Sequence, residues 1–159
     1  MDGFHLTKAQ LAAMSDPAHA MLRRGSPWTF DGRGFAEIVK RIGKQPDSVI
    51  WAPSFDHAVG DPVPESIRIE PTHRVVLVEG LYAHVRDEPW SDICNLVDQR
   101  WWIQPRNTEQ SLERLFQRHV EAGLAADRGA AIKRYETNDK LNSDYADKCR
   151  YPPHQVILN

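Results

Sequence analysis

Two acidic residues occupy positions in the sequence that suit a phosphate-binding site. Glu79 follows the apolar run at residues 75–78, and Asp2 comes directly before Gly3. In open α/β sheets, ligands bind beyond the carboxyl ends of the strands, so a carboxylate there can hold Mg²⁺ or orient reactants. Phosphoryl transfer needs a metal, cationic groups and a carboxylate that takes the acceptor's proton. Asp2 and Glu79 could both belong to such a set, although either could also be an ordinary solvated carboxylate.

Arginines could supply the matching positive charge. Arg114 and Arg118 lie four residues apart on one face of a predicted helix, and Arg128 and Arg134 follow. On a mobile flap, such guanidinium groups could neutralise the charge of a transferring phosphoryl group. A charge-rich helix is more often simply a solvated face, so the arginines alone do not establish this role.

A third group of residues suits the recognition of a small polar ligand. Phe55, Asp56 and His57 are consecutive and follow a short strand candidate, and Arg23 and Trp28 lie upstream. Aromatic, acidic and imidazole groups at a strand-end loop are typical of small-molecule sites. A single histidine is more often structural than catalytic, so this pattern also leaves both interpretations open.

Composition places these residues in a single globular domain. The 159 residues are 41% hydrophobic and 26% charged, and the net charge of −2 does not favour a general nucleic-acid binder. No apolar run approaches the roughly 20 residues that cross a bilayer, so we expect no membrane partner. Cys94 and Cys149 lack metal-ligand spacing. We therefore expect a cytoplasmic protein.

The elements that must position the candidate residues alternate between strands and helices. We predict helices at residues 8–14, 31–41, 108–123 and 126–142, and an irregular segment at 18–32. We predict strands at residues 49–52, 66–70, 75–78, 96–103 and 156–158, with a polar loop at 53–64. The run at 75–78 is typical of a strand buried on both faces. The alternation predicts α/β layering with a parallel sheet.

Taken together and in order, these segments resemble the P-loop small-molecule kinases of the uridine kinase, phosphoribulokinase and pantothenate kinase type. The segments that carry the resemblance are residues 1–6, 23–31, 53–62, 75–80 and a lid region at about 114–142. The second of them is similar to a loop of the uridine kinase-like, fructose-transport-associated branch. The resemblance covers essentially the whole chain.

The resemblance implies one domain over residues 1–159 with the family's three-layer α/β sandwich and parallel sheet. It implies ATP-dependent phosphorylation of a hydroxyl on a nucleoside, a pantothenate-like compound or a sugar, with ATP and Mg²⁺ as cofactors. Asp2 would be the catalytic base, Glu79 the metal-linked carboxylate, and Arg118 and Arg134 the lid residues that contact phosphate. The acceptor site would consist of His5, Arg23, Trp28, Phe55, Asp56 and His57.

The chain departs from the family in one respect, because its 159 residues contain no Gly-x-x-x-x-Gly-Lys-Ser/Thr loop. The Gly-Arg-Gly at residues 32–34 lacks the Lys and Ser/Thr. We therefore expect a truncated chain without its N-terminal strand, loop and helix, and no catalysis from the chain alone. The missing strand would leave an apolar seam that a completing N-terminal segment or a second copy could cover.

Two other interpretations stay open at this stage. The chain could be a non-catalytic module that keeps the acceptor pocket of a kinase and binds a small molecule or a protein. It could also be an unrelated α/β hydrolase of phosphate esters that uses Asp2 and Glu79. Covalent hydrolases of that kind place a Ser or Cys beside a base, and we find no convincing pair of this sort.

Overall fold

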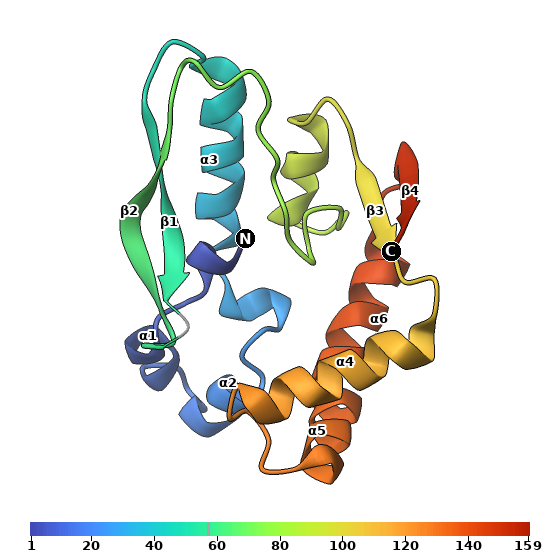
Figure 1. Cartoon of the computed structure of the whole chain (residues 1–159). Coiled ribbons are helices and arrows are strands. Elements are labelled where there is room, and N and C mark those ends of the chain that lie inside the picture. The colour runs from blue at the N-terminus through green and yellow to red at the C-terminus, as the bar shows by residue number, and fades with distance from the viewer. Residues whose placement is uncertain (57) are drawn as a thin grey trace.

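The computed structural model describes residues 1–56 and 58–159 (Figure 1). Its α-helices are α1 (Lys8–Ala12), α2 (Pro17–Leu22), α3 (Gly32–Lys44), α4 (Thr108–Glu121), α5 (Arg128–Arg134) and α6 (Lys140–Cys149). Short 3₁₀ helices are η1 (Asp2–Phe4), η2 (Pro27–Thr29) and η3 (Trp90–Asn95), and the π-helical segment η4 (Tyr135–Asp139) joins α5 to α6. The strands are β1 (Ile50–Asp56), β2 (Asp61–Ile69), β3 (Trp101–Gln104) and β4 (Gln155–Leu158).

The strands form two separate pairs. β3 and β4 are parallel, as we predicted, whereas β1 and β2 form an antiparallel hairpin. The predicted polar loop at residues 53–64 is wrong, because β1 continues to Asp56 and β2 already begins at Asp61. Pro53, Pro62 and Pro64 favoured a loop, but proline is tolerated in a strand that lies at the edge of a sheet. In a hairpin of two strands, both strands are edges.

The strand predicted at residues 75–78 does not form. Residues 75–80 have no regular secondary structure, and Val75 and Leu77 are 79% and 81% exposed. The backbone nitrogen of Met1 donates to the carbonyl of Glu79 at 2.8 Å, which fixes the end of the segment. A strand needs a neighbour along its edge to pair its backbone. In the described part of the chain, no strand pairs with these residues.

The core packs α3 against η3 and the segment that follows Gly80. The aromatic side chains of Phe30, Phe35, Tyr82 and Trp90 are all buried, and Trp90 contacts each of the other three rings at centroid distances of 5.3 to 6.3 Å. α3 buries Phe35 and Val39 in this core. This core fixes the start of α3 and the loop before it, which lead to the candidate site.

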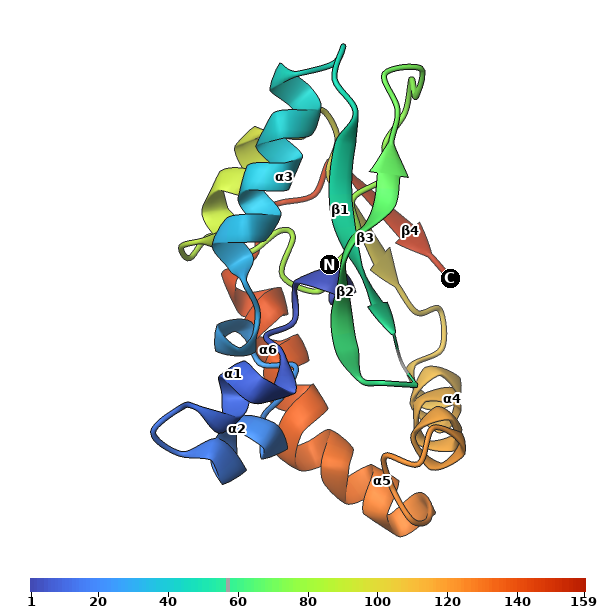
Figure 2. The ribbon, with the colours of Figure 1, turned by 90° about the vertical axis from the view of Figure 1, so that its left-hand side faces the viewer.

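The C-terminal helices form an arm below the strands (Figures 1 and 2). α4 agrees with the helix predicted at residues 108–123, and Gly123 ends it with a positive φ of 68°. The helix predicted at 126–142 is instead α5, the π-helical η4 and α6, and it continues to Cys149. α6 leads back from the arm toward β3 and β4, as both views show.

The segment predicted to be irregular at residues 18–32 contains the helix α2 and the 3₁₀ helix η2. Asp16 and Pro17 start α2, because the Asp16 carboxylate accepts from the backbone nitrogen of His19 and Pro17 occupies the first helical position. Among the described residues, every helix is too short or too polar to span a lipid bilayer.

Candidate functional site

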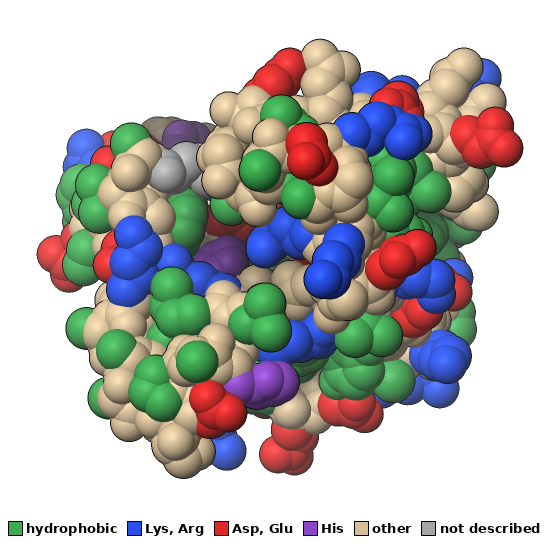
Figure 3. Space-filling model, turned by 90° about the horizontal axis from the view of Figure 1, so that it is seen from below, with side chains coloured by type: hydrophobic (Ala, Val, Ile, Leu, Met, Phe, Trp, Pro, Cys, Tyr) green, Lys and Arg blue, Asp and Glu red, His purple; other side chains and the backbone are tan. Residues whose placement is uncertain are grey.

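Viewed from below, the molecule is hollowed at its centre, and Lys, Arg and His side chains gather there (Figure 3). The candidate residues come from η1, the β1–β2 hairpin, the loop around residues 23–31, and the arm of α4 to α6.

The segments that carry the two candidate carboxylates meet at the first residue, where the Met1 nitrogen donates to the backbone carbonyl of Glu79 at 2.8 Å. Asp2 and Glu79 are both exposed. Burial lowers the pKa of the Met1 ammonium, whereas the charges of Glu79 and then Asp2 raise that pKa. Gly3 lets η1 approach β1 closely, because a Cβ at this position would overlap the Pro53 carbonyl. The fold thus brings together two acidic residues that are far apart in sequence.

His5 is the centre of an aromatic cluster beside these carboxylates. Its ring centroid lies 4.0 Å from that of Phe30 and 4.9 Å from that of Phe55, and its Nδ1 lies 2.9 Å from the Asp2 carbonyl oxygen. Burial is the main reason that the pKa of His5 is lowered; the Asp2 carbonyl and carboxylate oppose this, and Arg24 adds to it. His5 also lines an open groove of about 580 Å³.

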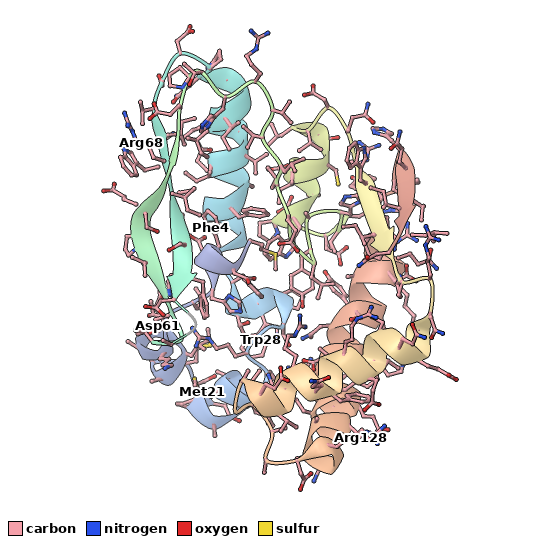
Figure 4. The ribbon with its side chains drawn as sticks, viewed as in Figure 1. Phe4, Met21, Trp28, Asp61, Arg68 and Arg128 are labelled. Atoms are coloured by element: carbon pink, nitrogen blue, oxygen red, sulfur yellow. The ribbon has the colours of Figure 1, made fainter. Side chains whose placement is uncertain are left out.

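The tip of the β1–β2 hairpin is hydrogen-bonded to α1 and to the loop around residues 23–31. Asp61 lies at the lower end of the hairpin, next to α1 (Figure 4), and its Oδ1 accepts from the Lys8 backbone nitrogen at 2.8 Å and from Arg24 at 3.0 Å. The Asp56 carboxylate accepts from the backbone nitrogens of Ala58 and Val59 and so shapes the turn. The predicted site residue His57 lies outside the described residues.

Two other predicted acceptor residues have their own partners. Arg23 points to the arm, where it donates to the Thr137 carbonyl and to the Asn142 side chain. Trp28 is 46% exposed and stacks on His19 of α2 at 5.9 Å, with the two rings 6° from parallel (Figure 4). Of the predicted acceptor residues, the structure therefore groups His5 with Phe55.

The arm places its candidate arginines on either side of a buried histidine. Arg118 is exposed, Arg134 is half-buried, and both contribute to a lowered pKa of His119. Burial is the largest cause of that shift, and Asp139, whose Oδ2 lies 3.3 Å from Nε2 of His119, opposes it. The Nε of Arg134 is buried without a hydrogen-bond partner among the described residues. Arg128 instead pairs with Glu113 of α4 at 2.8 Å.

Arg24, Asp61 and His119 lie in segments that carry the family resemblance (23–31, 53–62 and 114–142), but they were not among the predicted site residues. Arg24 and Asp61 join segments separated by 37 positions, and their side chains are 14% and 27% exposed. An Arg-Arg pair in a loop is the only signal that the sequence offers for Arg24. The burial of His119 depends on how α4 meets η4, and no local pattern shows this.

Among the described residues, the side chains do not form a metal site on their own. No group of three or more His, Cys, Asp or Glu side chains in residues 1–56 and 58–159 is arranged to hold a metal. Asp2 and Glu79 supply two carboxylates, and Mg²⁺ at phosphate sites takes one or two carboxylates and completes its shell with water and phosphate oxygens. The loop that would cradle the phosphates of ATP is not among the 159 residues.

Two relatives match nearly the whole chain, while no family model matches it. The chain is 44% identical to the ATP-dependent kinase-like protein notR′ of Aspergillus versicolor, over 99% of this chain and 92% of that protein. It is 38% identical to a protein of Schizosaccharomyces pombe named "Putative uridine kinase", over 99% of this chain and 66% of that protein.

Two crystal structures share the fold. YFH7 from Saccharomyces cerevisiae, described as a "putative P-loop containing kinase with a circular permutation", has a TM-score of 0.87 and 29% identity, over all of this chain and 56% of that chain. A "putative fructose transport system kinase" from Silicibacter sp. TM1040 has a TM-score of 0.85 and 28% identity, over 98% of this chain and 71% of that chain. The predicted P-loop kinase α/β fold is thereby confirmed. The chain spans only part of the length of both structures.

Proposed function

We propose a phosphoryl-transfer site in this chain, which belongs to the P-loop small-molecule kinases related to notR′, the S. pombe protein and YFH7. The reaction would move the γ-phosphoryl group of ATP to a hydroxyl of a small metabolite in the cytoplasm. The observation that carries the proposal is the hydrogen bond from the Met1 nitrogen to the Glu79 carbonyl, which brings Glu79 beside the segment that carries Asp2. A base and a metal-holding carboxylate at one place are what this chemistry requires.

Each residue has a proposed part in the transfer. The Asp2 carboxylate takes the proton as the acceptor oxygen forms its bond to phosphorus and the bond to the ADP oxygen breaks. Glu79 holds Mg²⁺, which neutralises phosphate charge when bound. Arg118 and Arg134 stabilise the same charge from the arm, because guanidinium groups match phosphate geometry. The exposure of Arg118 makes its guanidinium accessible for this role.

The acceptor is proposed to bind between η1 and the hairpin. His5 and Phe55 are the residues whose position supports this best, since they lie together beside Asp2. Burial keeps His5 neutral near pH 7, so its ring can serve as a hydrogen-bonding group without a charge. Arg23, Trp28, Asp56 and His57 stay predictions for this site. Nucleosides, pantothenate-like compounds and sugars remain the candidate acceptor classes.

We also propose that the 159-residue chain alone does not turn over. Without a glycine-rich loop, its residues offer no nest of backbone nitrogens and no Lys for the β- and γ-phosphates. A completing segment or a second copy could cover residues 75–77 and supply what is absent. In the alternative function, the chain is a binding module that uses only the acceptor site between η1 and the hairpin. The hydrogen bonds of Arg24 favour this second candidate, because they hold that site together within this chain.

Calorimetry and a radiometric assay test the proposal together. Uridine, pantothenate and fructose are titrated separately into the purified chain, and ATP with Mg²⁺ is titrated with and without them. We expect one of these acceptors to bind, and we expect neither ATP binding nor phosphate transfer. Transfer that Asp2→Asn abolishes would refute the inactivity and support the site. Transfer that survives Asp2→Asn would refute the role of Asp2, and binding of none of the three would refute the acceptor site.

A further inference from the structure

Two consecutive arginines reach opposite walls of the candidate site. Arg23 contacts the arm, through η4 and α6, and Arg24 contacts Leu6, which follows η1, and the tip of the β1–β2 hairpin. The arm and the hairpin are far apart in sequence, and the loop that carries the arginines lies between them. Both walls are therefore connected through a single dipeptide.

On the side of the arm, Arg23 is part of a mostly buried network. Its Nη1 donates to the Thr137 carbonyl at 2.7 Å, and its Nη2 donates to Asn142 Oδ1 at 3.2 Å. The same Asn142 oxygen accepts from the hydroxyl of Ser26 at 3.1 Å, and Ser26 and Asn142 are 1% and 5% exposed. Thr137 belongs to the π-helical η4, and π-helical turns occur frequently at functional sites.

On the side of the hairpin, Arg24 makes three hydrogen bonds. Its Nη1 donates to the Gly60 carbonyl at 2.5 Å, and its Nη2 donates to the Leu6 carbonyl at 2.9 Å and to Asp61 Oδ1 at 3.0 Å. Its guanidinium also lies 5.6 Å from the ring centroid of Phe55. The pKa of Asp61 is lowered, first by the Lys8 backbone hydrogen bond and then by Arg24.

The loop between the two walls is itself held firmly. The Tyr82 hydroxyl, from the core, donates to the carbonyl of Gly25 at 2.6 Å, and Thr29 donates to the Ser26 carbonyl at 2.8 Å. Gly25 has a φ of 110°, a value that favours glycine. A loop fixed to the core in this way can transmit the position of one wall to the other.

We propose that Arg23 and Arg24 are positioning residues, which we call the arginine brace. Arg23 holds the arm, which carries Arg134, and Arg24 holds the hairpin, which carries Phe55. Together the two arginines fix the separation of the arm and the hairpin. A role of the arginine brace in phosphoryl transfer rests on the proposed function, whereas the hydrogen bonds that define the brace do not depend on it. Arginine suits the task because its planar group donates several hydrogen bonds in fixed directions.

Hydrogen exchange of the full chain, followed by mass spectrometry, tests the brace directly. We expect Arg23→Ala to raise exchange in η4 and α6 about tenfold or more and to leave β1 and β2 unchanged, since a charged hydrogen bond is lost. Arg24→Ala should do the reverse. Each variant is the matched control of the other. A uniform rise over the whole chain, or no change in the expected wall, would overturn the proposal.

Further variants separate positioning from general stability. Asn142→Ala removes one Arg23 bond together with the Ser26 bond to the same oxygen. It should give the same local effect in the arm, and the double variant with Arg23→Ala should add little to it. Independent, additive effects would contradict the pairing. Arg24→Lys keeps the charge and one donor group, so it should restore part of the hairpin's protection. No restoration at all would show that charge contributes nothing at this position.

A ligand measurement shows whether the brace serves the acceptor site. Uridine, pantothenate and fructose are titrated into the wild-type chain and both alanine variants. For whichever binds, we expect Arg24→Ala to weaken the affinity about tenfold and Arg24→Lys to recover part of it. An unchanged affinity would overturn the link to the acceptor. If none binds the wild type, the proposed function fails, while the exchange data still decide on the brace.

Discussion

At the scale of single residues, the histidines carry more structural information than their number suggests. His5, His84 and His119 are all buried enough that burial is the main cause of a lowered pKa. His119 lies against Asp139 on one side and has Arg118 and Arg134 in its surroundings. Burial therefore disfavours protonation of these three histidines in the folded chain.

This predicts that the free energy of unfolding falls on acidification. Because the folded pKa of each histidine lies below the unfolded value, the unfolded chain binds more protons, and stability is lost as the pH falls below about 6.5. Each histidine contributes a slope of at most about 1.4 kcal/mol per pH unit. Urea denaturation of wild type and His119→Asn between pH 8 and pH 5 measures this slope. A slope that is the same in both proteins would contradict the role of His119.

At the scale of elements, the ends of the long helices are set by side chains that the sequence shows clearly. Asp31 accepts from the Gly34 nitrogen at 2.8 Å and starts α3, and Asn107 accepts from the Gln110 nitrogen at 3.0 Å and starts α4. Both are residue types that favour the N-cap position. The start of α3 also matters for the site, because the preceding loop carries the arginine brace.

We predict that Asp31→Ala destabilises the protein by about 1 kcal/mol, because the first turn of α3 loses its cap. Asp31→Asn keeps the capping oxygen and should cost much less. Urea denaturation monitored by circular dichroism would compare the two variants at pH 7. Equal losses in both would mean that the charge of Asp31, and not the cap, supports the helix.

Elements that depend on distant partners were predicted less well. The helices α3 and α4 were predicted correctly because capping residues and apolar periodicity are local signals. Residues 75–80 have the composition of a strand but do not form one, because no strand in the described part of the chain lies beside them. Prolines hid the hairpin, and no sequence pattern signals the π-helical η4. For the site, the motifs indicated Asp2 and Glu79, whose meeting depends on tertiary structure. Sequence could not show that Arg23 turns to the arm, because its partners lie over a hundred positions away.

At the scale of the whole molecule, the unpaired segment 75–80 is the feature that most needs a partner. Val75 and Leu77 are among the most exposed large hydrophobic residues in the described part of the chain, and Val76 is 36% exposed. In the β3–β4 pair, Ile103 of β3 is 62% exposed. Exposed apolar side chains beside unpaired backbone favour association through strand addition.

We predict that the chain self-associates with rising concentration and that Val75→Lys combined with Leu77→Lys weakens this association at least about tenfold. Burial of each such side chain contributes about 1.5–3 kcal/mol, and about 1.4 kcal/mol changes an equilibrium tenfold. Sedimentation velocity over a dilution series measures the effect. Leu22→Lys combined with Leu124→Lys is the matched control, since these residues are 65% and 54% exposed elsewhere. A wild-type chain that stays monomeric throughout, or an equal effect of the control pair, would exclude residues 75–77 as the surface that drives association.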